Sequence, residues 1–347
     1  MSKKFFAWLL VLSLLVVVLA GCGSSNNASK DAASENAAPT SNEGEKTGPY
    51  KISVIVKATD SDYWQTLIAG AKAAEKDSNG KIVVTPDGPP SETDIDKQVS
   101  ILENVISTKP DGIVIASTSS DATVPAVEKA VSQGIPVITI DNQLNTDKYT
   151  SFLATDHRKA AAAAAEAMVE DWKKMGVDPS GKKVIAISSV AGTKVNTERT
   201  EGFIEKIKEL VPDIVVLETQ YADNDISKAL SIAENTIAAN PDLIGIFADN
   251  NHMGVGVAKA LEETGKYKDI VCYAFDTNED EITALKNGIL RGLVVQNPFK
   301  MGYDGVMYAV DAIEGKEVPK NVIVDATIVT KENMDDPEIH KLLYPLE

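Results

Sequence analysis

From residue 50 onward, short runs of β-branched and aliphatic residues alternate about ten times with longer segments of helical periodicity. This alternation predicts parallel strands joined by crossover helices, which is the doubly wound α/β architecture. The expected strands form two series, the first at 52–56, 82–85, 112–115, 137–140 and 151–153, and the second at 184–187, 214–217, 243–247, 271–275 and 292–295. Because each series holds enough strands for a sheet of its own, the sequence predicts two lobes.

The segments between the expected strands are typical of helices that pack on a sheet. In the segment 92–108, the apolar residues Ile95, Val99, Leu102 and Ile106 recur at spacings of four, three and four. That spacing places them on one face of a helix, which predicts burial against the core.

Two further segments predict helices with particular ends or faces. An alanine-rich run at 160–168 predicts a closely packed helix, with Asp156 as its N-cap. We interpret His157 as a residue at the start or rim of that helix rather than as a catalytic base. Gly254 and Gly256 lie within a helical pattern and predict close helix packing.

The first residues of the chain predict its compartment. Lys3 and Lys4 precede an apolar segment at 5–19, which is shorter than the roughly 20 residues that span a bilayer and suits a secretory signal. The sequence Leu-Ala-Gly-Cys that ends at Cys22 resembles the lipobox of bacterial lipoproteins, so we predict a lipoprotein signal peptide at 1–21 and a lipidated Cys22. A leader that is cleaved without lipid, or one that stays as an anchor, is the alternative.

Residues 22–49 consist mainly of small and polar residues and predict a disordered tether. With Cys22 lipidated, only Cys272 remains, so the exported domain can form no internal disulfide. Cys272 lies in an apolar run, which predicts a buried, unreactive thiol. We expect the protein to be held outside the cytoplasm on the cell membrane, at a Gram-positive surface given the long tether, or otherwise in a periplasm.

Composition and missing motifs narrow the function. The formal net charge of −17 disfavours binding to nucleic acid, whose phosphates would be repelled. The chain lacks the GxSxG elbow, the GxxxxGK loop and a GxGxxG pattern after the first strand, and it has no HExxH or paired CxxC spacing. We therefore expect a protein that is not an enzyme and that needs no cofactor or metal.

Polar side chains follow most of the expected strands. Asp141, Asp276 and Gln296 each come directly after a strand, and the carboxyl ends of parallel strands face the crevice where open α/β sheets bind their ligands. Other residues that follow strands are Ser61, Tyr63, Trp64, Asn142, Asn224 and Asn250. Carboxylates accept hydrogen bonds from hydroxyls, amides both donate and accept, and aromatic faces cover the C–H side of a sugar ring. This combination suits a neutral polyhydroxyl ligand.

With these residues in this order, the chain resembles the ribose-binding branch of the type I periplasmic solute-binding proteins. The resemblance covers about 52–329, and its most specific segments are IPVITIDNQ at 135–143, AGTKVNTERTEGF at 191–203, IFADNNHMGVGVAKAL at 246–261, FDTNED at 275–280 and VVQNPFKMG at 294–302. Members have two lobes joined by three hinge crossings, bind a sugar in the cleft between them and deliver it to an ABC importer. The resemblance implies one lobe at 50–155 plus 297–325 and another at 156–296 plus 326–347.

The resemblance also implies which residues bind the ligand. These are Ser61, Tyr63, Trp64, Asp141, Asn142, Thr197, Asn224, Asn250, Asp276 and Gln296. Three of them depart from the ribose pattern, since Asn142 and Thr197 replace arginines and Asn224 replaces an aromatic residue. Arg199 matches a framework position.

These departures leave the identity of the sugar open. Without the two arginines, we expect Asp141 and Asp276 to face the ligand with no guanidinium beside them. That arrangement favours a neutral sugar, a polyol or an amine-bearing sugar over an anion. The alternative for both aspartates is that they cap the following helix or turn, and the alternative for Tyr63 and Trp64 is that they belong only to the core.

The expected partners are a small neutral sugar or polyol, the permease of an ABC transporter, and the membrane through the lipid anchor alone, with the protein itself a monomer. A ligand-presenting sensor for a chemoreceptor or histidine kinase is the main alternative. Repressor effector domains share the fold but carry an N-terminal DNA-binding segment, where this chain has a leader and tether. A glycosidase would require Asp141 and Asp276 to flank a scissile bond.

Overall fold

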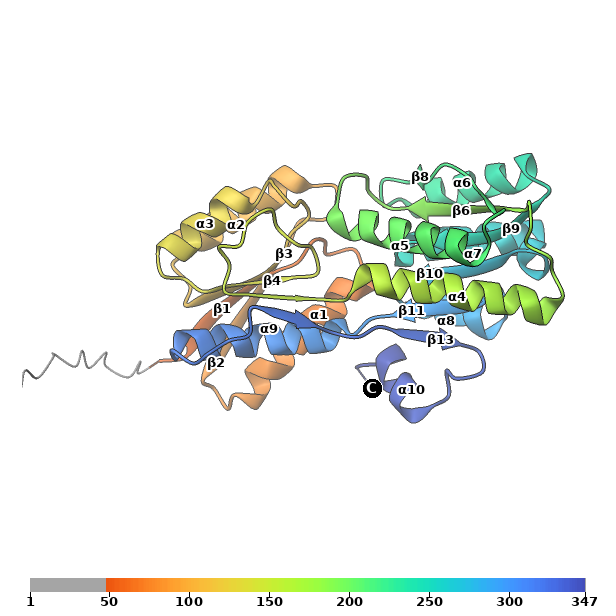
Figure 1. The fold of residues 1–347 in the computed structure, drawn as a ribbon. Coiled ribbons are helices and arrows are strands. Elements are labelled where there is room, and N and C mark those ends of the chain that lie inside the picture. Colours follow the sequence, from red (N-terminus) through yellow and green to blue (C-terminus); the bar gives the residue numbers. More distant parts are fainter. Residues whose placement is uncertain (1–47, 347) are drawn as a thin grey trace, which may run out of the picture. The chain divides into compact units, whose positions relative to one another are not determined.

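The computed structural model describes residues 48–346. The predicted signal peptide at 1–21, Cys22 and almost all of the predicted tether lie outside these residues. Within them, the chain forms two β-sheets, each covered by helices on both faces (Figure 1). This is the two-lobe α/β architecture that the alternation of strands and helices predicts.

The first sheet has six strands, all paired in parallel in the order β12-β5-β4-β3-β1-β2. Its strands are β1 (Tyr50–Ile55), β2 (Ile82–Asp87), β3 (Gly112–Ala116), β4 (Val137–Ile140), β5 (Ser151–Ala154) and β12 (Asn321–Ile323). The sequence pattern does not predict β12, because this edge strand of three residues is mostly exposed and has no buried apolar run.

Four helices enclose the first sheet. They are α1 (Asp62–Asp77), α9 (Pro298–Ile313), α2 (Ile95–Ser107) and α3 (Val124–Ser132). Side chains alternate along the strands, so that Ile52 and Val54 join the core beneath α1 and α9 while Ile55 joins the core beneath α2 and α3. The helix α2 begins at Ile95, later than predicted, and Glu92 is left in the preceding turn.

The second sheet has seven strands, in the order β13-β11-β10-β9-β6-β7 with β8 also paired to β6. Its strands are β6 (Lys183–Ser188), β7 (Val215–Val216), β8 (Gln220–Tyr221), β9 (Leu243–Ala248), β10 (Val271–Phe275), β11 (Gly292–Val295) and β13 (Thr327–Thr330). The sheet is parallel, as predicted, except at one edge, where β13 pairs with β11 in the antiparallel direction. The chain enters β13 beside the last residue of β11, so β13 runs away from that end of the sheet, in the direction opposite to β11.

Helices also cover both faces of the second sheet. On one face lie α4 (His157–Met175) and α5 (Lys194–Leu210). On the other face lie α6 (Ile226–Ala239), α7 (Asn251–Thr264) and α8 (Glu279–Lys286), together with the short helices η1 (Lys266–Lys268) and α10 (Pro337–Leu343). Among the described residues, no helix is both long enough and apolar enough to cross a membrane.

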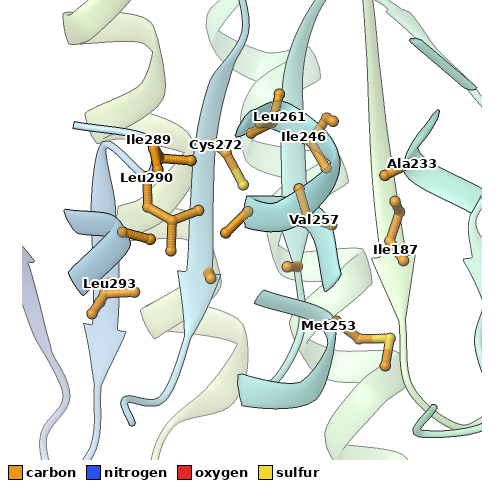
Figure 2. Packing of buried hydrophobic residues seen from close by; sticks show 14 of the residues in the cluster. Ile187, Ala233, Ile246, Met253, Val257, Leu261, Cys272, Ile289, Leu290 and Leu293 are labelled. Atoms are coloured by element: carbon orange, nitrogen blue, oxygen red, sulfur yellow. The ribbon is translucent and has the colours of Figure 1, made fainter. Parts of the chain in front are cut away.

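The core beneath α7 contains the one cysteine of the second sheet. Figure 2 shows Cys272 on β10 among Ile246, Leu261 and Leu290. The thiol is fully buried, and burial raises its pKa well above the usual range. The prediction of a buried thiol is therefore confirmed, and the raised pKa disfavours the reactive thiolate.

Two glycines allow α7 to pack closely, as predicted. A Cβ atom at Gly256 would lie 2.6 Å from the Cβ of Ala229 on α6. A Cβ atom at Gly254 would lie 2.0 Å from Oε1 of Glu281 on α8. Both distances are too short for real contacts, so a side chain at either position would force neighbouring atoms to shift.

Three connections carry the chain between the two sheets. They run from β5 to α4, from β11 to α9 and from β12 to β13. The first two end at helix N-caps, since Asp156 accepts a 3.0 Å bond from Lys159 N and Asn297 accepts a 2.9 Å bond from Lys300 N. Caps of this kind fix where each crossing stops and the next helix begins. The predicted N-cap role of Asp156 is thereby confirmed.

Candidate functional site

Asp141 and Asp276 lie directly after β4 and β10, one in each sheet. Both have left-handed backbones, with φ of 66° and 74°, a conformation that costs a non-glycine residue about 1–3 kcal/mol and tends to occur at functional sites. Neither aspartate caps a helix. The N-cap of α8 is Asn278, whose side chain accepts a 2.8 Å bond from Glu281 N, and residues 142–150 after Asp141 contain no helix. The helix-capping alternative is therefore wrong.

Two cations and a histidine surround the Asp141 carboxylate. Lys57 Nζ lies 2.5 Å from Oδ2, while His157 Nε2 and an Arg199 nitrogen lie 3.4 and 3.9 Å from Oδ1. Burial raises the pKa of Asp141, but Lys57, and then His157 and Arg199, outweigh burial and hold it well below its usual range. The carboxylate therefore stays ionised in the folded protein.

The Asp276 carboxylate has fewer partners. Gln296 Nε2 donates a 2.5 Å bond to Oδ1, and Arg199 Nη1 lies 3.7 Å from Oδ2. Burial raises the pKa of Asp276, and Arg199 and Gln296 only partly offset that rise. Of the two strand-end acids, Asp276 is thus the one that more readily accepts a proton.

The expectation that these acids lack a nearby guanidinium is wrong. Arg199 on α5 contacts both Asp141 and Asp276, and its Nη1 also donates a 2.7 Å bond to the Asp249 carbonyl. Its Nε donates to His157 Nδ1 at 3.2 Å, so the remaining ring proton of a neutral His157 is on Nε2, which faces Asp141. Arg199 is thus part of the site as well as of the framework. This chain lacks two arginines of the ribose pattern, and Arg199 and Lys57 instead supply the positive charge beside the two acids.

Residues from both sheets line a cavity between them. They are Lys57, Ser61, Tyr63, Trp64, Glu92, Asp141, Ser189, Val195, Asn196, Arg199, Asn250, Asn251 and Asp276. Its volume of about 20 Å³ holds little more than one water molecule. A sugar ring can enter only if the sheets move apart or these side chains turn aside. We call this space the inner cavity.

Tyr63 and Trp64 belong both to the core and to the inner cavity. They are buried against apolar residues of α1 and α9, and their rings meet edge to face with centroids 4.7 Å apart. Trp64 Nε1 donates a 2.7 Å bond to Glu92, and Lys57 Nζ lies 5.5 Å from the indole ring. Burial raises the pKa of Glu92, with Lys57 and Trp64 opposing that rise.

Amides from the second sheet complete the inner cavity. Asn250 caps α7 by accepting a 3.0 Å bond from Met253 N, and its Nδ2 donates a 2.7 Å bond to Asn224. Asn251 Nδ2 donates a 3.2 Å bond to Ser61 Oγ in the other lobe. The cleft is therefore bridged by side-chain hydrogen bonds that a ligand could replace.

Four predicted ligand-binding residues do not line the inner cavity. Thr197 bonds to the Thr193 carbonyl of its own helix at 2.9 Å, and Asn142 lies 3.4 Å from Ser120 Oγ. Asn224 lies behind Asn250, and Gln296 contacts Asp276 from a neighbouring groove. The other six, which are Ser61, Tyr63, Trp64, Asp141, Asn250 and Asp276, come together around the cavity.

The predicted ligand-binding set omits several residues of the cavity, namely Lys57, Glu92, Ser189, Asn196 and Asn251, and it treats Arg199 only as framework. The rule that polar residues after a strand line the cleft applies to four of them, since Ser189 directly follows β6 and Asn251 lies three residues after β9. Lys57 follows β1 by two residues, and Glu92 lies in the loop after β2. Expecting the helix to begin at residue 92 concealed Glu92, whereas Lys57 directly follows the expected strand at 52–56 and was not considered as a ligand-binding residue.

Asp249 lies beneath the cavity at the end of β9. Its carboxylate accepts bonds from the Ser188 hydroxyl and, at 2.8 Å, from Ser189 N. Burial raises its pKa from 3.8 to about 6, although these bonds and Arg199 oppose the rise. The folded protein thus binds the Asp249 proton more tightly than the unfolded chain.

This shift predicts a pH dependence of stability. Because the pKa is raised on folding, stability is lost as the pH rises through the window from about 4 to about 6, by up to about 3 kcal/mol. We expect Asp249→Asn, which cannot ionise, to lose less stability than the wild type over this window. Urea unfolding at pH 4, 5, 6 and 7 measures the difference. If the free energy of unfolding of the two proteins changed in parallel with pH, folding would not raise the pKa of Asp249.

Among residues 48–346, no cluster of three histidine, cysteine or acidic side chains could hold a metal ion. The inner cavity instead offers acceptors on Asp141, Asp276 and Glu92, donors on Lys57 and Arg199, and amides that do both. Such a set can bind hydroxyl groups on several sides at once.

Two α/β lobes, joined by three crossings and closing on a cavity of buried acids, cations and amides, define a two-lobe solute-binding protein. The chain belongs to the periplasmic binding protein domain family, whose sequence profile matches residues 52–317. More narrowly, it is a ribose-binding-like type I member, within the sugar-binding solute-binding proteins of ABC transporters.

Named relatives support this assignment. The ribose import binding protein RbsB of Bacillus subtilis (strain 168) is 30% identical over 85% of this chain and 91% of its own length. RbsB of Escherichia coli (strain K12) is 31% identical over 81% of this chain and 90% of its own length. These relatives are binding proteins for import rather than enzymes, and the chain is accordingly a binding protein and not an enzyme.

Solved structures agree with the sequence relatives. A carbohydrate transporter solute-binding protein from Agrobacterium radiobacter, in complex with D-arabinose, has a TM-score of 0.82 and 36% identity, covering 86% of this chain and all of its own. An ABC transporter solute-binding protein from Agrobacterium vitis, with bound D-fucose, has a TM-score of 0.79 and 35% identity, covering 85% of this chain and all of its own.

Proposed function

We propose that the protein is a lipid-anchored, extracytoplasmic solute-binding protein that captures a neutral sugar or polyol between its lobes and delivers it to an ABC importer. The observation that carries this proposal is that Asp141 and Asp276, which directly follow strands of different sheets, both contact Arg199 beside one cavity. The lipobox-like sequence before Cys22 supports the anchor. The protein acts as a monomer.

In this proposal, the first lobe consists of residues 50–155 and 297–325. The second lobe consists of residues 156–296 and 326–347. The placement of β12 in the first sheet and β13 in the second supports this division. Ligand that contacts both lobes binds their closed arrangement better than an open one, so it shifts the population toward closure. A permease that recognises the closed arrangement would then accept only the loaded protein.

The charges in the cavity support a neutral ligand. Lys57 and Arg199 already pair with Asp141 and Asp276, so an anion would have to displace a carboxylate from its cation. Asp141, which lines the cavity, has its Oδ1 buried without a hydrogen-bond partner. Hydroxyl groups can donate to such an acceptor and accept from Lys57 at the same time. An amino sugar, whose amine could donate to the same acceptor, is the alternative ligand.

A thermal-shift panel tests this function. We expect D-ribose, D-arabinose, D-fucose, D-galactose or a polyol to stabilise the protein by about 2.7 kcal/mol at a ligand concentration 100 times the Kd. We expect no stabilisation by aldonic acids or amino acids. Stabilisation by anions alone would contradict the proposal, and stabilisation by amino sugars alone would select the alternative ligand.

A further inference from the structure

One side-chain contact joins the two lobes outside the inner cavity. Lys194 of the second lobe donates a hydrogen bond from its Nζ to Oε1 of Gln143 in the first lobe, and the contact is partly buried. Neither residue lines the inner cavity. A sugar bound in that cavity therefore has no need to displace this contact, unlike the bond between Asn251 and Ser61. We call the pair of Lys194 and Gln143 the interlobe contact.

The loop that carries Gln143 is fixed to the first lobe. It connects β4 to β5. Asn145 Nδ2 donates a 2.7 Å bond to Asp121, in the segment just before α3. Thr146 Oγ1 donates a 2.7 Å bond to Glu128 on α3 itself. Gln143 is therefore presented to the second lobe from a loop that moves together with the first.

Lys194 is the first residue of α5. The N-cap of this helix is Thr193, which accepts a 3.3 Å bond from Asn196 N. The N-terminal end of a helix carries a partial positive charge, so a cation there is unfavourable for the helix itself. The ammonium of Lys194 thus does not stabilise its own helix, and its hydrogen-bond acceptor lies in the other lobe.

Both sides of the interlobe contact are continuous with walls of the inner cavity. Asp141 lies two residues before Gln143 and lines the cavity from the first lobe. Val195 and Asn196 directly follow Lys194 and line it from the second. When the lobes separate to release a bound sugar, these two walls move apart. The contact between Lys194 and Gln143 breaks with them.

We propose that the interlobe contact is a latch, which slows the release of a bound sugar without touching the sugar. This inference rests on the proposed function, since the latch acts on a ligand held between the lobes. The contact joins the lobes only when they are closed, so it stabilises the closed arrangement relative to the open one. It does so equally for every sugar, because neither residue lines the inner cavity.

Stopped-flow dissociation kinetics test the latch. The ligands are D-ribose, D-arabinose, D-fucose, D-galactose and D-sorbitol, and Trp64, which lines the inner cavity, supplies the fluorescence signal. Lys194→Met removes the ammonium but keeps a long side chain. We expect it to raise the dissociation rate constant by about three- to tenfold, since a typical hydrogen bond contributes this much to an equilibrium. The factor should be the same for each ligand that binds.

Matched variants identify the contact itself. Gln143→Ala should raise the dissociation rate constant by the same factor, and the double variant with Lys194→Met should raise it no further, since both changes break one contact. Lys194→Arg keeps a cation that donates hydrogen bonds and should retain slow release. Lys208→Met removes a lysine from an exposed position in the last turn of α5 and should leave release unchanged.

The possible failures can be told apart. If a sugar binds but Lys194→Met releases it at the wild-type rate, the latch is overturned while the proposed function stands. Effects of Lys194→Met and Gln143→Ala that multiply in the double variant would also overturn it, because the two residues would then act independently. A factor that differs between sugars would assign Lys194 to ligand contact instead. If none of the five ligands binds the wild type, the proposed function fails and the latch fails with it.

Discussion

Asp141→Ala is expected to abolish sugar binding and to destabilise the unliganded protein. Asp141 is 3% exposed and lies 2.5 Å from the ammonium of Lys57, which is itself 4% exposed. Removing one partner of such a buried pair leaves an uncompensated charge and costs about 3–5 kcal/mol. The effect on binding is separate from this loss of stability. Each hydrogen bond between a charged group and the sugar contributes about 1.5–3 kcal/mol to the binding free energy, so affinity should fall by about 10- to 150-fold for each bond lost.

A double variant separates the two effects of Asp141. Combining Asp141→Ala with Lys57→Met removes the unpaired ammonium, so urea unfolding should show the double variant to be more stable than Asp141→Ala alone. Calorimetry should show that neither variant binds sugar. If Asp141→Ala bound sugar with wild-type affinity, the carboxylate would not contact the ligand.

Arg199→Met is expected to reduce both stability and sugar binding by a similarly large amount, because Arg199 contacts an acid in each lobe. Arg199 is 4% exposed, contacts Asp141 and Asp276, and packs with its guanidinium carbon 4.1 Å from the centre of the Phe275 ring. Methionine keeps part of the apolar stem but leaves the two acids without this cation. We expect a loss of about 3–5 kcal/mol at pH 7, together with loss of sugar binding.

The pH dependence of Arg199→Met identifies the cause of that loss. Arg199 lowers the pKa of Asp276 against the effect of burial, so the variant should raise that pKa further. A higher folded-state pKa means that stability falls more steeply with rising pH than in the wild type, and that acidification partly restores it. Arg199→Lys, which keeps the charge, should show a smaller change. A loss for Arg199→Met that is equal at pH 5 and pH 8 would assign Arg199 to packing alone.

Much of the fold could be predicted from the sequence because it follows from local patterns. Buried parallel strands are continuous apolar runs, and helices on a sheet carry an apolar stripe, so the strands that begin with Ile82, Val137 and Val271 could be located before the structure was known. The strands β8, β12 and β13 could not be located from the sequence, because they are short and mostly lie at sheet edges with few buried residues.

The candidate site was predictable only where a residue follows a buried strand. Asp141 and Asp276 meet that condition, and the structure places both beside the inner cavity. The partners of these acids could not be predicted in the same way. Lys57 is 84 residues from Asp141 in sequence, and Arg199 reaches the site from the middle of a helix, where an arginine ordinarily faces solvent. Their pairing depends on how the two sheets close, which no local pattern contains.

The central claim is that one neutral sugar is held, unaltered, between the two lobes. A crystal structure of the protein with the sugar that gives the largest thermal shift tests it most directly. The account predicts electron density for an intact sugar with hydroxyl oxygens about 2.6–3.2 Å from the side chains of Asp141, Asn250 and Asp276. Density for the sugar on another surface, or for a cleaved product in the cleft, would contradict it.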